Sequence, residues 1–141
     1  MTQENKDLLL KDLCSRLPYG VKMNHIADDE HSPKTLIGVA KDMITLEGLS
    51  GYECVDVEDY KPYLFPLSSM TEEQKEELKN EISKQTDILI ERMKNDDCGI
   101  DCGKYHFHSL LELEWLLKNH FDYRGLIPKG LAIDATNKGI Y

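Results

Sequence analysis

The sequence predicts an α+β fold: an N-terminal helix, a small antiparallel sheet or small barrel of about three to five strands, and then two amphipathic helices. Three observations support this prediction. Leucines recur every four residues near the N-terminus, β-rich runs with polar breaks follow, and two helix-start signals precede amphipathic segments in the second half. A chain of 141 residues has the length of one ordinary domain, so we assign residues 1–141 to a single unit.

The first helix is predicted at about residues 5–17. Leu9, Leu13 and Leu17 lie four residues apart, which is the spacing of one helical face. Pro18 follows directly, and proline does not continue a helix. We therefore expect the leucine face of this helix to pack on the rest of the domain.

The β region is predicted at about residues 19–67. In its first part, β-rich runs are separated by short polar breaks, and one run alternates with the period of two that a strand requires. A hairpin is predicted where two runs flank Lys41 and Asp42. About three or four short antiparallel strands in this length indicate a meander that curls into a small sheet or barrel. The runs are Val21–Ile26, Thr35–Val39, Met43–Leu46 and Tyr52–Val57.

The β region ends with the segment Tyr60–Leu67, which contains Pro62 and Pro66. Proline has no N–H group to donate to a neighbouring strand, so this segment is not expected in the middle of a sheet. We expect an extended strap that lies over apolar surface and links the two halves of the chain.

Two capping boxes predict where the later helices begin. Thr71–Gln74 and Ser109–Glu112 each place a hydroxyl three residues before a side chain that can bond back to the first N–H groups. The helices are predicted at about residues 71–94 and 109–119. Residues 134–141 are expected to form a polar, loosely held tail.

Charge and composition narrow the classes of function. The net charge is -9, and the only arginines are Arg16, Arg92 and Arg124. Binding to many phosphates requires clustered Lys and Arg, so we do not expect nucleic acid as a partner. The first residues are polar, and no run approaches the roughly 18 apolar residues of a membrane span, so we expect a cytoplasmic protein without a membrane partner.

A metal site is one hypothesis for Cys98, Cys102, His106 and His108. Two thiolates and two imidazoles close in sequence are the ligands of a tetrahedral zinc site. Structural zinc sites usually separate their two histidines by about three to five residues, which this spacing does not match. The alternative is an ordinary loop between two helices, which its glycines and aspartates favour. We favour the loop and expect no cofactor.

A second candidate site is the run His120–Ile127. His120 and Asp122 are residue types of an acid–base pair, and Arg124, which follows Tyr123, could bind an oxyanion or phosphate. The structural alternative buries the aromatic and aliphatic side chains, while the charged ones cap helix ends or pair locally. We favour the structural interpretation over catalysis and keep these four as candidate binding residues.

Known catalytic signatures are missing from the sequence, which contains no nucleophile elbow, Walker loop, dinucleotide fingerprint or H-E-x-x-H motif. An enzyme is therefore the less favoured class. We expect a non-enzymatic interaction protein that binds an unknown protein partner or itself through its apolar strap and helices. Two alternatives stay open: a small metal-dependent hydrolase that uses the C-terminal histidines, and a small barrel that binds nucleic acid.

Three phrases, Lys11–Val21, Lys61–Thr71 and Asn119–Ile127, resemble an uncharacterised family of small proteins from gut bacteria. The resemblance spans nearly the whole chain. It implies an accessory protein of a prophage or mobile element, and it supplies no catalytic residues because the family has no assigned activity. A weaker resemblance, between residues 21 and 57, is to the hairpin of Sm-like and related small barrels, without their basic and aromatic RNA-binding loop residues.

Overall fold

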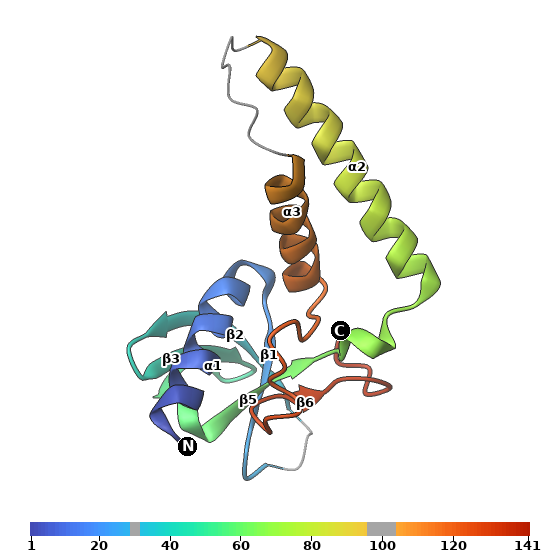
Figure 1. Cartoon of the computed structure of the whole chain (residues 1–141). Coiled ribbons are helices and arrows are strands. Elements are labelled where there is room, and N and C mark those ends of the chain that lie inside the picture. Colours follow the sequence, from blue (N-terminus) through green and yellow to red (C-terminus); the bar gives the residue numbers. More distant parts are fainter. Residues whose placement is uncertain (29–31, 96–103) are drawn as a thin grey trace.

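The computed structural model describes residues 1–28, 32–95 and 104–141, and within helices α2 and α3 it describes the side chains of 72–88, 91 and 109–118. Figure 1 shows a body, made of helix α1 and a curved sheet, and an arm, made of α2 and α3, that projects from it. The predicted α+β class is confirmed. The helices are α1 (Gln3–Arg16), α2 (Glu72–Asn95) and α3 (Lys104–Lys118), with short 3-10 segments at Leu17–Tyr19, Val57–Asp59 and Leu67–Ser69.

The sheet has six strands in the order β4-β3-β2-β1-β5-β6, and the first five pair antiparallel with one another. The predicted number of about three to five strands is therefore too low. The additional strand, β6, has only two residues and pairs parallel to β5, and so short a segment carries no periodicity of its own. The strands are β1 (Lys22–His25), β2 (Lys34–Ala40), β3 (Met43–Gly48), β4 (Gly51–Asp56), β5 (Tyr60–Leu64) and β6 (Ile133–Asp134).

The core lies between α1 and the sheet. Leu9 and Leu13 of α1 are fully buried, as their spacing predicts. The predicted hairpin is confirmed by pairing of β2 with β3 across Lys41 and Asp42, with Lys41 at a φ of 54°. Residues near the C-terminus complete the core. The core residues are Leu9, Leu13, Val21, Met23, Leu36, Ile44, Leu46, Val57, Tyr60, Leu64, Leu126, Leu131 and Ala132.

The expected strap is instead a strand inside the sheet, because β5 lies between β1 and β6. Pro62 pairs with Met23 of β1. The short β6 reaches only Tyr63 and Leu64, so on that side Pro62 has no strand neighbour to which it would need to donate. The proline rule excludes a ladder position with neighbours on both sides, and this position has a neighbour on one side only.

The first capping box is confirmed and the second is wrong. The Thr71 N–H donates to Gln74 Oε1 (2.9 Å), and the Gln74 N–H donates to Thr71 Oγ1 (3.2 Å). Ser109 lies inside α3, which begins five residues earlier at Lys104. The preceding residues continue the helix, so the serine is not at a helix start. None of the helices in the described residues is long and apolar enough to span a membrane.

The C-terminal tail is held on the body, contrary to the expectation of a loose segment. Tyr141 is 47% exposed as a residue, yet its ring stacks on His120 with 3.9 Å between ring centroids. Its hydroxyl donates to the Tyr63 carbonyl oxygen (2.8 Å) and accepts from the Lys22 N–H (3.1 Å). The last residue therefore ties β1 and β5 to the end of α3.

Replacing Tyr141 with Phe tests this attachment. The variant keeps the stacked ring and loses both hydrogen bonds of the hydroxyl, so we expect the free energy of unfolding to fall by about 1–2 kcal/mol. Urea unfolding followed by circular dichroism measures the change. Tyr52→Phe is the matched control. Tyr52 is 72% exposed, so this variant should lower the free energy of unfolding by less than about 0.5 kcal/mol. Equal losses in the two variants would contradict the attachment.

Candidate functional site

The run His120–Ile127 lies where α3 returns to the body. The Phe65 N–H donates to the His120 carbonyl oxygen (2.9 Å), and the Asp122 N–H donates to the Phe65 carbonyl oxygen (2.8 Å). Phe121 is buried, and its ring stacks on that of Trp115 of α3, with centroids 5.8 Å apart and planes 14° apart. This run therefore joins the base of the arm to the chain that follows β5.

Asp122 holds the turn after Phe121. Its side chain is buried, and its two oxygens accept the N–H groups of Leu126 and Ile127, both at 2.8 Å. Gly125 within this turn has a φ of 69°, a conformation that glycine adopts without steric cost. Both carboxylate oxygens are thus engaged with the backbone and not with His120.

Arg16 links α1 to this turn from inside the protein. Arg16 and Asp12 have fully buried side chains, and Arg16 Nε donates to Asp12 Oδ2 at 2.6 Å. Arg16 Nη2 donates to the carbonyl oxygen of Phe121 at 2.7 Å. A buried charge is tolerated when it is paired and hydrogen-bonded, and here the pairing also joins the N-terminal helix to the base of the arm.

Arg124 lies against the same carboxylate. Its Nε is 3.4 Å from Asp12 Oδ1, and its guanidinium lies over the Tyr123 ring, 4.6 Å from the centroid. The Arg16 guanidinium is 5.8 Å from the same ring. Burial raises the pKa of Tyr123, so the phenol stays neutral between the two cations. We call Asp12, Arg16, Phe121, Tyr123 and Arg124 the anchor.

His120 is buried beside the anchor and adopts a left-handed φ of 60°. Within the described residues its Nδ1 has no hydrogen-bond partner. Burial, with the positive charges of Arg16 and Lys22, lowers its pKa from 6.5 to about 4. The imidazole is therefore neutral at physiological pH and packs as an aromatic ring against Tyr141.

The metal hypothesis concerns residues that the structure describes only in part. Cys98 and Cys102 lie outside the described residues, and His106 and His108 lie in α3 at positions whose side chains are not described. In the part of the chain that is described, no group of three His, Cys, Asp or Glu side chains could hold a metal ion. The zinc site stays a prediction.

A polar cluster near one end of the sheet was not predicted from the sequence. Lys34 of β2 forms an ion pair with Glu53 of β4 and lies 3.2 Å from the Tyr60 hydroxyl of β5, which donates to Glu53 (3.0 Å). The hydrogen bond from Lys34 lowers the pKa of Glu53, so the pair stays charged. These groups satisfy one another and brace three strands. A neighbouring cleft of about 420 Å³ is lined by Ser32, Pro33, Lys34, Gly48, Leu49 and Ser50.

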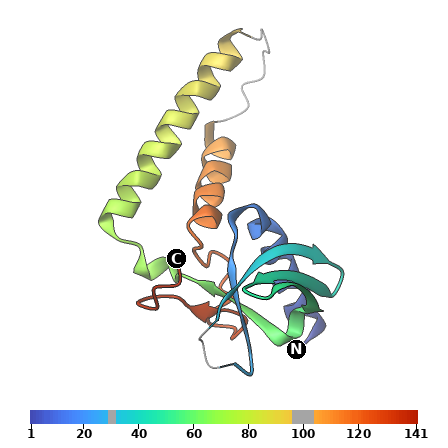
Figure 2. The ribbon, with the colours of Figure 1, turned by 180° about the vertical axis from the view of Figure 1, so that it is seen from behind.

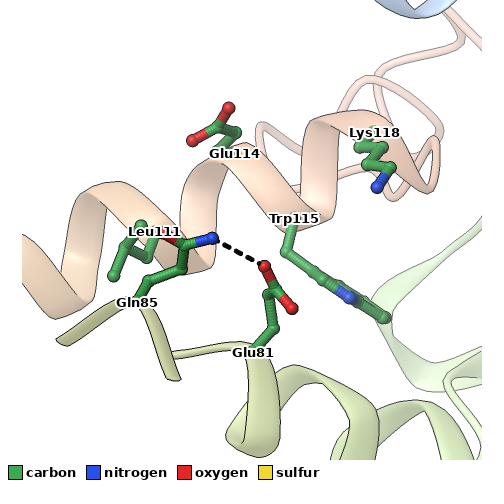
Figure 3. A pocket seen from close by; sticks show the side chains of 6 residues that line it. All are labelled: Glu81, Gln85, Leu111, Glu114, Trp115 and Lys118. Atoms are coloured by element: carbon green, nitrogen blue, oxygen red, sulfur yellow. Dashed lines mark hydrogen bonds between the residues drawn. The ribbon is translucent and has the colours of Figure 1, made fainter. Parts of the chain in front are cut away.

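The arm contains a groove between α2 and α3 with a volume of about 240 Å³. Figure 3 shows Trp115 of α3 pointing toward α2, where Gln85 donates to Glu81 at 3.0 Å. Trp115 is 5% exposed and stacks on Phe121, so one wall of the groove rests on the anchor. The groove is lined by Glu81, Gln85, Leu111, Glu114, Trp115 and Lys118.

Comparison with known proteins found no family model that matches the chain, and no curated protein or solved structure that matches it significantly. The similarity to a prophage-associated family therefore stays a prediction from the sequence. The four candidate binding residues are close in sequence, but their side chains have different partners: His120 stacks on Tyr141, Asp122 accepts two backbone N–H groups, and Arg124 lies over the Tyr123 ring and against Asp12. Their role in binding stays a prediction. Sequence analysis missed Asp12 and Arg16, whose i,i+4 spacing beside the leucines of α1 was the available signal.

The contacts of the anchor predict that replacing Arg16 costs much more stability than replacing Arg124. Arg16→Ala leaves Asp12 buried without its closest cation and removes the donor to Phe121, so we expect a loss of about 3–5 kcal/mol in the free energy of unfolding. Arg124→Ala removes a side chain that is 20% exposed and leaves Asp12 paired with Arg16, so it should cost about 1 kcal/mol or less. Urea unfolding followed by the fluorescence of Trp115, the single tryptophan, measures both. Similar losses would show that the chain does not depend on Arg16 in this way.

The burial of neutral His120 predicts that the free energy of unfolding falls in acid. The pKa of His120 in the folded protein, about 4, lies below the ordinary 6.5, so protonation favours the unfolded chain. The buried neutral ring therefore contributes its full stabilisation above about pH 6.5, and this stabilisation is lost as the pH falls toward 4. The loss should be between about 1 and 3 kcal/mol, since one pKa unit is about 1.4 kcal/mol.

The variant His120→Asn tests this, because asparagine tolerates the left-handed backbone. Urea unfolding at a series of pH values should show a constant difference between variant and wild type above about pH 7. Below that pH the difference should shrink. A difference that stays constant down to about pH 4 would contradict the assignment to His120.

Proposed function

We propose that this protein is a non-enzymatic interaction protein whose arm binds a protein partner. The observation that carries the proposal is the exposure of α2. Every α2 side chain that the structure describes (72–88 and 91) is exposed or half-buried. Most helices in proteins are stabilised by packing an apolar face, so a helix of 24 residues that buries none of these side chains is expected to have a further contact.

Helix α3 also supports a docking role because it has two apolar faces. Leu111 and Trp115 face the groove with α2, whereas Leu113 is on nearly the opposite side of the helix. On that second side exposure rises with distance from the body: Leu117 is 8% exposed, Leu113 is half-buried and Leu110 is 62% exposed. The apolar stripe therefore continues beyond the surface that the body covers.

The anchor supports the proposal by giving the arm a fixed base. Arg16 holds the Phe121 carbonyl oxygen, and the Phe121 ring stacks on Trp115 at the base of α3. A docking surface that is already ordered loses less conformational entropy when it binds. The charged groups nearest the arm serve this support, since Asp122 binds backbone N–H groups and Arg124 lies against Asp12.

A mobile-element setting and a cytoplasmic location belong to the same proposal. The support for the first is the resemblance of three phrases of the sequence to a prophage-associated family. The support for the second is that the four cysteines do not form the dense framework of a small secreted domain, so reduced thiols are expected.

A photo-crosslinking amino acid at Leu110 tests the proposal in cells that express the full chain. We expect a covalent adduct of defined mass with a protein, because Leu110 is an exposed part of the apolar stripe. The matched control is the same amino acid at Leu49, a fully exposed leucine of the body, where no specific adduct is expected. The absence of any adduct at Leu110, or the same adducts at both positions, would refute docking through the arm.

A further inference from the structure

We propose that the partner of the arm is a second copy of this chain, and that two arms pack antiparallel into a four-helix bundle. This inference rests on the proposed function and names its partner. Figure 2, seen from behind, shows that the arm projects away from the sheet, as in Figure 1. The described side chains of α2 (72–88 and 91) are exposed or half-buried, so this helix is accessible to a second molecule.

The geometry of the arm is that of half a bundle. Helix α2 is roughly 36 Å long at 1.5 Å per residue, and α3 packs beside it. Two helices alone can cover only one face of each other. Four-helix bundles bury the remaining apolar positions by adding a second pair, with short connections within each pair. The exposed Ile88 (38%) and Leu110 (62%) are available for such a second pair.

The groove between α2 and α3 offers a specific place for a helix of the second copy. Side chains of one helix pack as ridges into the grooves of another. This groove has Trp115 on one wall and about 240 Å³ of free volume. The groove is lined by two carboxylates, Glu81 and Glu114, and by Lys118, a net charge of -1, so a helix segment with a positive net charge suits it better than a negative one.

Helix α2 itself has that charge in its second half. Residues 72–83 contain five glutamates and two lysines, a net charge of -3, whereas residues 84–95 contain three cations and two carboxylates, a net charge of +1. In an antiparallel pair, the negative half of each α2 lies against the positive half of the other. A parallel pair would place the two negative halves together, which is unfavourable. The charge pattern therefore selects a second α2 in antiparallel orientation.

Light scattering coupled to size-exclusion chromatography tests the second copy directly. We expect the wild-type chain of 16.2 kDa to elute with twice that mass at micromolar concentrations. The double variant Ile88→Glu/Leu110→Glu should weaken dimerisation by roughly a hundredfold or more, because it places charge in the apolar contact. Leu49→Glu is the matched control and should remain dimeric, since Leu49 lies in the body.

Two outcomes of this experiment would overturn the second copy: a wild-type monomer at high micromolar concentration, or a double variant that dimerises as strongly as the Leu49→Glu control. Both replaced side chains are exposed in the single chain. The near-UV circular dichroism of the variant should therefore match that of the wild type, which separates lost dimerisation from lost folding.

A photo-crosslinker at Glu73 tests the orientation in a mixture of isotopically light and heavy protein. Adducts that join light and heavy chains identify contacts between two copies. The antiparallel bundle predicts adducts from position 73 to residues near 92–95, and adducts to residues 72–76 would overturn the antiparallel arrangement.

The two proposals fail in different ways. If the protein is a monomer and its Leu110 crosslinker captures a different protein in cells, dimerisation through the arm is contradicted and the role of the arm in binding a protein partner is supported. A monomer without any Leu110 adduct in cells would overturn both.

Discussion

The rest of the structure depends on one buried guanidinium, that of Arg16. It pairs with Asp12 one helical turn earlier and donates to the carbonyl oxygen of Phe121, a residue 105 positions away. A charge in a protein interior is costly unless it is paired and its donors are used, so this contact ties the first helix to a single position of the returning chain. The direction in which α3 leaves the body follows from it, because the Phe121 ring supports Trp115.

The need to pair buried polar groups also explains the run after α3. It has residue types that are common in active sites, but most of them make structural contacts. Asp122 uses both oxygens on the backbone of its own turn, and Arg124 lies between a buried carboxylate and the face of Tyr123. His120 is kept neutral by burial near positive charges. Polar groups that are brought into an interior need partners. Asp122 finds them in the backbone, and Arg16 finds them in Asp12 and the Phe121 carbonyl oxygen, whereas Arg16 Nη1 and His120 Nδ1 have no hydrogen-bond partner among the described residues.

The body and the arm differ in how many of their side chains have contacts within the chain. In the body, the leucines of α1 cover the sheet. The polar cluster of Lys34, Glu53 and Tyr60 links three strands, and the Tyr141 hydroxyl bonds to β5. In the arm, α2 and α3 pack against each other and the base of α3 rests on Phe121 and α1, and the described apolar side chains of α3 become more exposed away from the body. Such a division is what an interaction protein requires, since a rigid support lowers the entropic cost of docking an exposed surface.

The sequence by itself determined the local elements: the leucine face of α1, the hairpin at Lys41 and Asp42, and the capping box at Thr71 that begins α2. Each depends on residues within a few positions of one another, so periodicity and capping chemistry are sufficient to predict it. The sequence also singled out the run after α3, but not what its side chains contact.

Only the tertiary structure decided the place of Pro62 inside the sheet, the short strand β6, the attachment of Tyr141 and the contact of Arg16 with Phe121. These contacts join segments that are far apart in the chain. Which segments meet depends on the arrangement that buries the core and pairs most internal polar groups at the same time, and no local pattern contains that information.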